Sequence, residues 1–130
     1  MGLAGTRVMA SFTDGDVSLT RGDTDFLDGT AVKPDGTPQD LTGWTIRFIA
    51  KRRFSDPDAA AALLKSTGGG GITITNAAQG LYTVAIVPAD TAGLANGAQT
   101  FYGWAVGTDP LGEVNTLWEG LVRLGPGGFL

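Results

Sequence analysis

The sequence predicts one all-β domain, an antiparallel β-sandwich of seven or eight strands, and three observations support this class. Hydrophobic and polar residues alternate with a period of two in most apolar segments, as they do in strands with one buried face. Turn-forming residues separate these segments at intervals of about 8–12 residues. The 21 glycines follow no collagen-like period, and no long segment has helical periodicity. A chain of 130 residues suits one domain.

The strongest strand pattern covers residues 44–51. Trp44, Ile46, Phe48 and Ala50 occupy one phase of it, so we expect them to point into the core. Gly29 interrupts a further strand and is expected to mark a bulge. The other predicted strands lie at 17–20, 26–32, 72–75, 82–86, 101–108 and 113–124.

Turn chemistry and two short helical patterns connect these strands. Residues 76–80 and 109–112 are short enough to close hairpins, and 33–38 form a Pro/Asp-Gly turn. A cap residue and a proline precede residues 59–64, which are expected to be helical. Residues 88–94 predict one helical turn that crosses between the sheets.

The composition excludes most catalytic chemistry. The chain has no Cys and no His, so it lacks the usual general base and the commonest metal ligand. Glu113 and Glu119 lie ~20 Å apart on one predicted strand, whereas a glycosidase pair requires roughly 5–10 Å. No serine lies in a Gly-x-Ser-x-Gly elbow. We expect a protein that is not an enzyme and that has no catalytic residues and no cofactor.

The net charge and hydropathy of the chain restrict the classes of partner that we expect. The net charge of -4 and the pI near 4.5 argue against nucleic acid. No apolar run approaches the ~20 residues of a membrane helix, and residues 1–12 do not resemble a secretory signal. We expect an N-terminal arm at 1–15, the sandwich at 16–124 and a tail at 125–130.

The acidic and basic clusters predict surface contacts rather than ion sites. Asp23 and Asp25 are the candidates for a cation, but no calcium loop surrounds them, so no metal site is expected. Arg21-Gly22-Asp23 spells the tripeptide that integrins recognise, and it is expected to be a turn.

Five residues are candidate partner contacts. Lys51, Arg52 and Arg53 end a predicted strand and suit either a solvated rim or an ion pair with a neighbouring subunit. Phe129 and Leu130 end the sequence with two large apolar groups, which are expected to fold back on the domain or to dock on a neighbour.

Aromatic residues raise the alternative of a sugar site. Trp44 and Tyr82 lie in the apolar phase of their strands and are expected in the core. Tyr102 and Trp104 share a face with Val106 and are likewise expected in the core. Trp118 is the candidate for a sugar-facing aromatic, because a bulge at Gly120 could reverse its face.

Several segments resemble a known family. They are VSLTRGDT at 17–24, DGTPQDLTGWTIRF at 35–48, ALLKS at 62–66, GITIT at 71–75, PADTAGL at 88–94 and GEVNT at 112–116. In this order they resemble the immunoglobulin-like domains of tailed-bacteriophage virion proteins, and in particular the N-terminal domain of phage upper-baseplate proteins. The resemblance covers about residues 16–124. It implies an immunoglobulin-like sandwich in which 59–66 is at least partly a strand.

The resemblance also implies a role. Such domains attach or assemble tail and baseplate parts, but upper-baseplate proteins continue well beyond this domain, whereas this sequence ends soon after it. We therefore expect a small structural protein of the virion, a minor tail, baseplate or neck component. Its expected partners are other virion proteins, including copies of itself. The alternatives are a capsid decoration protein and a carbohydrate-binding or adhesion module on the particle surface.

Overall fold

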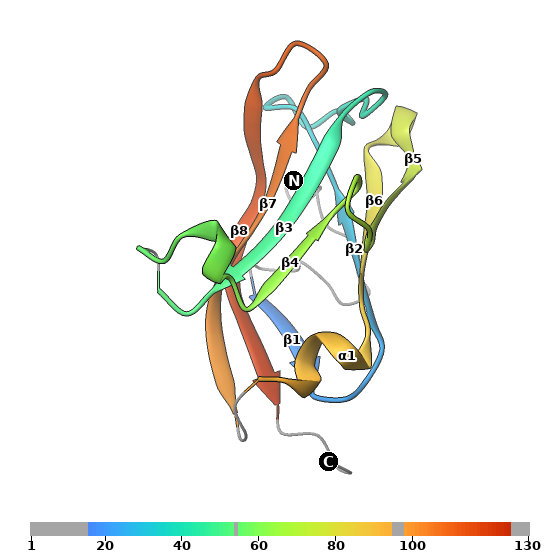
Figure 1. Cartoon of the computed structure of the whole chain (residues 1–130). Helices are drawn as coiled ribbons and strands as arrows, with labels where there is room; N and C mark the ends of the chain where they lie inside the picture. Colours follow the sequence, from blue (N-terminus) through green and yellow to red (C-terminus); the bar gives the residue numbers. More distant parts are fainter. Residues whose placement is uncertain (1–15, 54, 95–97, 126–130) are drawn as a thin grey trace.

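A computed structural model describes residues 16–53, 55–94 and 98–125 and arranges them as two packed β-sheets (Figure 1). The larger sheet contains, in spatial order, β1 (Asp16–Thr20), β8 (Val114–Gly125), β7 (Gln99–Thr108), β3 (Thr45–Lys51) and β4 (Leu63–Ser66). The smaller sheet contains β2 (Asp25–Thr30), β6 (Leu81–Ile86) and β5 (Ile72–Asn76). The helices of the described residues are α1 (Pro88–Ala92) and two 3₁₀ turns, Asp58–Ala60 and Ala77–Gln79. In the described ranges none of them could span a membrane.

The strand order is that of an immunoglobulin-like domain, as predicted. β2, β6 and β5 take the places of strands B, E and D, and β8, β7, β3 and β4 take those of G, F, C and C′. All neighbouring strands are antiparallel except β1, which pairs with β8 in parallel. The eight strands of the described residues match the predicted number of seven or eight.

The core lies between the two sheets and follows the predicted alternation on β3 and β6. Ile46, Phe48 and Ala50 are fully buried, whereas Trp44 is half-buried and packs at the margin of the core. Every second residue of β6 is also buried. The Phe48 ring stacks on Trp118, with 6.0 Å between the ring centroids and 20° between the ring planes. Apolar packing of these rings joins the strands of the larger sheet to one another.

The predicted phase of β7 is wrong. Its aromatic side chains at 102 and 104 face outward, and the buried positions are Phe101, Gly103, Ala105 and Gly107. The cause is steric, because side chains of β8 occupy the space on the core side of β7. A Cβ atom at Gly103 would lie 2.7 Å from Val122 Cγ2 and 3.0 Å from a Trp118 ring atom. The core side of β7 therefore accommodates only small residues from Gly103 to Gly107, and the rings of Tyr102 and Trp104 lie on the other face.

The prediction that a bulge at Gly120 turns Trp118 toward solvent is also wrong. Gly120 pairs in register with Gly103, and the bulge lies at Leu117, between the pairs Ala105–Trp118 and Val106–Thr116. The extra residue sets Trp118 on the core side, where it is only 9% exposed. A sugar could not stack on this ring.

Two further local predictions require correction. Gly29 forms no bulge, because it pairs in register with Tyr82. Residues 59–64 are not a helix: a 3₁₀ turn ends at Ala60 and β4 begins at Leu63, so the strand that the resemblance implied is confirmed.

The helical turn predicted at 88–94 is confirmed as α1, and the hairpins predicted at 76–80 and 109–112 are confirmed.

Substitution of Gly29 by Ala should destabilise the smaller sheet. A Cβ atom at Gly29 would lie 2.4 Å from Cζ of the Tyr82 ring, which is buried and cannot move aside easily. We expect the free energy of unfolding, measured in urea, to fall by ~1–3 kcal/mol. Gly68→Ala is the matched control, because nothing lies within 4 Å of its added Cβ. Equal stability of the two variants would contradict this packing.

Candidate functional site

Arg21 of the integrin-like tripeptide is part of the core. It follows β1, is 2% exposed and is one of the largest fully buried side chains of the described residues. Its Nη1 atom donates hydrogen bonds to the carbonyl oxygens of Thr91, at 3.0 Å, and Leu94, at 2.9 Å. The Asp23 amide donates to the Thr20 carbonyl at 3.0 Å, which confirms the predicted turn. The buried guanidinium is inaccessible to a receptor.

The acceptors of Arg21 explain why a charged side chain is stable there. Backbone carbonyls near a helix end can accept further hydrogen bonds from side-chain donors. The Arg21 guanidinium donates to the Thr91 carbonyl in α1 and to the Leu94 carbonyl two residues beyond the end of α1. Beside it, the Gly22 amide donates to the Thr91 hydroxyl at 3.0 Å, and the Arg21 amide donates to the Gly125 carbonyl at 3.1 Å. The site is structural, and it joins three distant parts of the chain.

The acidic residues considered for a cation do not converge. The Asp25 carboxylate accepts a 3.5 Å hydrogen bond from the Thr20 amide. Among residues 16–53, 55–94 and 98–125, no group of three or more acidic side chains could hold a metal ion. Asp23 and Asp25 therefore gain no support as ligands.

The three predicted basic contacts differ in their surroundings. Lys51 Nζ lies 2.7 Å from Asp58, and Arg47 Nη2 lies 3.0 Å from the same carboxylate. Hydrogen bonds from Lys51 and then from Arg47 hold the pKa of Asp58 below its usual value. Arg52 donates to the Gln99 side-chain oxygen at 3.2 Å and remains exposed, as does Arg53. The other two predicted contacts, Phe129 and Leu130, lie outside the described residues, as does the predicted arm 1–15.

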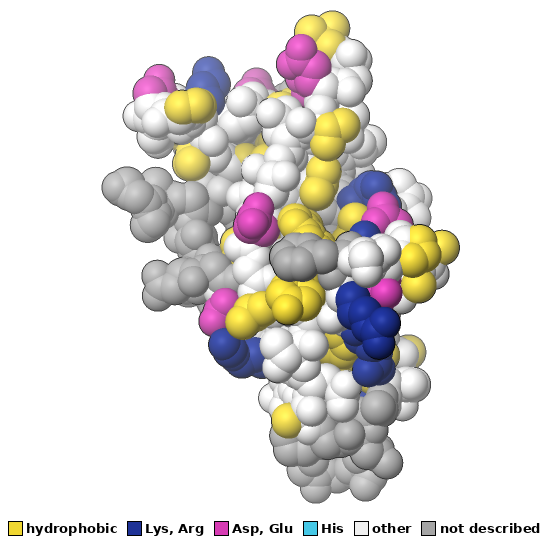
Figure 2. Space-filling model, turned by 90° about the vertical axis from the view of Figure 1, so that its left-hand side faces the viewer, with side chains coloured by type: hydrophobic (Ala, Val, Ile, Leu, Met, Phe, Trp, Pro, Cys, Tyr) yellow, Lys and Arg dark blue, Asp and Glu magenta, His cyan; other side chains and the backbone are white. Residues whose placement is uncertain are grey.

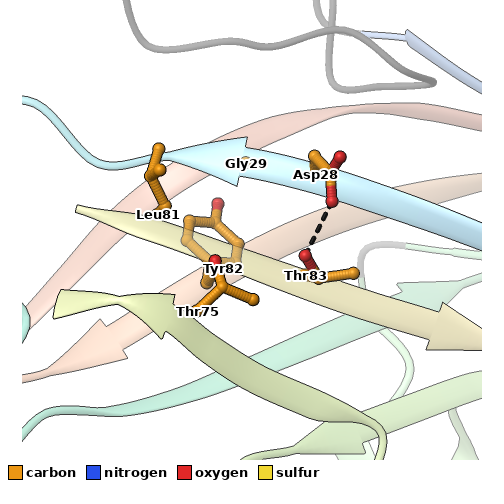
Figure 3. A pocket seen from close by; sticks show the side chains of 6 residues that line it. All are labelled: Asp28, Gly29, Thr75, Leu81, Tyr82 and Thr83. Carbon is orange, nitrogen blue, oxygen red and sulfur yellow. Dashed lines mark hydrogen bonds between the residues drawn. The ribbon is translucent and has the colours of Figure 1, made fainter. Parts of the chain in front are cut away.

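One polar pocket of about 310 Å³ lies between β2, β6 and β5 (Figure 3). Its side chains include Asp28 and Thr83, whose hydroxyl donates to the Asp28 carboxylate at 2.6 Å. The Tyr82 ring points across Gly29, and burial raises the pKa of its phenol well above the ordinary value. The phenol is therefore neutral, and among the residues that the structure describes Asp28 is the sole carboxylate lining the pocket. These described residues provide no acid–base pair.

A second hollow, which we call the outer groove, lies on the solvent-facing side of the larger sheet. It has a volume of about 190 Å³ and is lined by the side chains of Asp16, Tyr102, Trp104, Glu119 and Leu121, with the paired Gly103 and Gly120 between them. Figure 2 views the molecule from the side of this sheet and shows hydrophobic side chains along the middle of the face, with acidic and basic ones on both sides. The sequence did not predict this groove, because it assigned Tyr102 and Trp104 to the core.

The β7–β8 hairpin extends beyond the other strands at one end of the sandwich (Figure 1). Near its turn, Leu111 is 87% exposed and Val114 is 66% exposed. The Asp109 carboxylate accepts hydrogen bonds from the Leu111 and Glu113 amides, both at 2.9 Å. We call Leu111 and Val114, with this turn, the hairpin tip. Its two apolar side chains are exposed on a turn that internal hydrogen bonds hold in place.

Comparison with known proteins finds solved structures that are similar to this chain. No family model and no curated protein sequence matches the chain. The chain is similar to the N-terminal domain of phage TP901-1 ORF48, with a TM-score of 0.46 and 14% identity over 92% of this chain and 94% of that one. It is also similar to AggA, the major subunit of aggregative adherence fimbriae type I from Escherichia coli, with a TM-score of 0.33 and 13% identity over 83% and 88%.

Replacement of Arg21 by Ala should destabilise the whole sandwich. The change removes two charge-assisted hydrogen bonds and leaves the Thr91 and Leu94 carbonyls without this donor. We expect the free energy of unfolding to fall by about 3 kcal/mol. Arg53→Ala, which removes an exposed guanidinium, should change it by less than ~0.5 kcal/mol. A thermal or urea unfolding curve like that of the unmodified chain would show that Arg21 does not hold α1.

Proposed function

We propose that this protein is a structural component of a tailed-phage virion, a minor tail, baseplate or neck protein that acts through protein–protein contacts and not as an enzyme. The order of the segments at 17–24, 35–48 and 88–94 supports the virion as its location. The main observation in support of an assembly role is the hairpin tip, which exposes two apolar side chains.

The hairpin tip suits a contact with another protein for two reasons. Burying Leu111 or Val114 against a partner is worth ~1.5–3 kcal/mol for each side chain. The turn needs little ordering on binding, because the Asp109 carboxylate already fixes it and Gly112 has the positive φ of 91° that the turn requires. A preorganised apolar projection of this kind gains affinity at low entropic cost.

Further contacts complete the proposed assembly surface. β4 and β5 are edge strands, whose outer backbone groups suit the addition of a strand from a neighbour. Arg52 and Arg53 lie exposed at the end of β3 beside Lys51, where an acidic partner could approach them. The sequence adds Phe129 and Leu130 as apolar contacts. Partners of this kind are other virion proteins, including copies of the same chain.

Two other roles use the same fold. A capsid decoration protein would assemble through the same kind of contact and differs only in its place on the particle. An adhesion or carbohydrate-binding module would instead present a recognition site to solvent, and the outer groove is the feature that favours it. Imaging of intact particles with the labelled protein distinguishes tail, neck and head locations, and absence of the label from purified particles would contradict the proposal.

Polar substitution of the hairpin tip should reduce assembly without unfolding the domain. We expect Leu111→Ser/Val114→Ser to lower incorporation into particles by ~10-fold or more, because two apolar contacts are lost. The melting temperature should not change, since both side chains are exposed. Phe26→Ser is the matched control: this side chain is 58% exposed on β2 of the smaller sheet. Normal incorporation of the hairpin variant would exclude the tip as a contact.

Deletion of Phe129 and Leu130 should also weaken incorporation. If each side chain is buried in a neighbour, each contributes ~1.5–3 kcal/mol to the contact. We expect the isolated domain to keep its unfolding midpoint, because β8 ends at Gly125. Incorporation is measured by the amount of the protein in purified particles. Full incorporation of the truncated chain would show that these two residues are not part of the assembly surface.

A further inference from the structure

The outer groove combines two aromatic rings on one strand. Tyr102 and Trp104 are two residues apart on β7, which places both on the outer face about 7 Å from each other. Tyr102 is 38% exposed and Trp104 is half-buried. Because Gly103 and Gly120 pair between the lining side chains, the backbone forms the floor of the groove. The result is a shallow aromatic surface on the outer face of the larger sheet.

Charged groups of both signs surround these rings. Glu119 is the register partner of Trp104, and Asp16 lies beside Leu121, the partner of Tyr102. On the opposite side, Lys51 Nζ lies 5.6 Å from the centroid of the Trp104 ring. Arg123 Nη2 lies 3.3 Å from the Asp16 carboxylate. Asp16 and Glu119 therefore line the groove as acceptors, and the cationic groups of Lys51 and Arg123 lie near its margin in ion pairs with Asp58 and Asp16.

This mixture of charges selects the class of ligand. Lys51 and Arg123 disfavour a small cation, and Asp16 and Glu119 disfavour an anion. A neutral polyhydroxy ligand satisfies both sets, because each hydroxyl donates to a carboxylate and accepts from an ammonium or guanidinium group. The C–H face of a sugar ring is apolar and can lie flat on an aromatic ring such as that of Tyr102.

We propose that the outer groove binds a saccharide, with the sugar ring stacked on Tyr102 and its hydroxyls hydrogen-bonded to Glu119 and Asp16. The groove, at about 190 Å³, is smaller than the pockets that enclose drug-sized ligands and is open to solvent. The saccharide therefore lies on the sheet, and a longer glycan extends across it. This inference goes beyond the proposed assembly role and does not depend on the hairpin tip.

Nuclear magnetic resonance of the full chain labelled with ¹⁵N tests this site. The probes are glucose, galactose and N-acetylglucosamine oligosaccharides, with an Arg/Lys-rich peptide as the competing class. We expect at least one oligosaccharide to shift the Trp104 indole resonance, assigned with Trp104→Phe, and the amides at 102–104 and 119–121. Tyr102→Ala and Glu119→Gln should each weaken this binding by ~5-fold or more.

A control variant separates the groove from non-specific binding to aromatic rings. Phe26→Ala removes an exposed ring from the smaller sheet and should leave saccharide binding unchanged. The proposal is overturned if no oligosaccharide shifts these resonances, if Tyr102→Ala binds as well as the unmodified chain, or if only the basic peptide shifts them. Tyr102→Ala should still enter particles normally, so failure of saccharide binding leaves the assembly role untouched.

Discussion

The buried guanidinium of Arg21 is the interaction on which one end of the sandwich depends. A buried charge is costly unless it is hydrogen-bonded, and here the carbonyls of Thr91 in α1 and of Leu94 just beyond α1 supply the acceptors. The same residue contacts the last residue of β8 through its backbone, while Gly22 contacts the Thr91 side chain. The first turn, the crossover from the smaller to the larger sheet and the last strand are therefore fixed together. The β7–β8 hairpin projects at the opposite end, with Leu111 and Val114 exposed near its turn (Figure 1).

The sizes of the side chains on the two faces of β7 determine which residues the larger sheet exposes to solvent. Trp118 and Val122 fill the space behind Gly103, so β7 places only small residues on the core side from Gly103 to Gly107, whereas Phe101 is buried in the core. Tyr102 and Trp104 lie on the outer face, where an antiparallel sheet usually carries polar groups. Packing inside the sandwich thus favours the placement of the Tyr102 and Trp104 rings on the outer face, where they line the outer groove.

The sequence predicts the fold well in strands whose buried residues follow from the strand's own alternation of hydrophobic and polar residues. The alternation on β3 and β6, and the strand order implied by the resemblance, agree with the structure. Prediction failed where burial depends on another strand. The small residues of β7 look polar or neutral until the ring of Trp118 is placed behind them. Trp118 itself depends on a bulge at Leu117 that carries no glycine or proline to mark it. Burial of Arg21 could not be predicted, because its acceptors lie about 70 residues away in the chain.

Parallel pairing of β1 with β8 has a consequence for the order of folding during synthesis. Leu121 in β8 donates to Asp16 in β1 across a separation of 105 residues. The larger sheet therefore cannot gain this strand until almost the whole domain has left the ribosome. Contacts of such long range slow folding, and until they form the edge of β8 remains open to other strands. A nascent chain of this domain is most exposed to wrong pairing just before its last strand closes on its first.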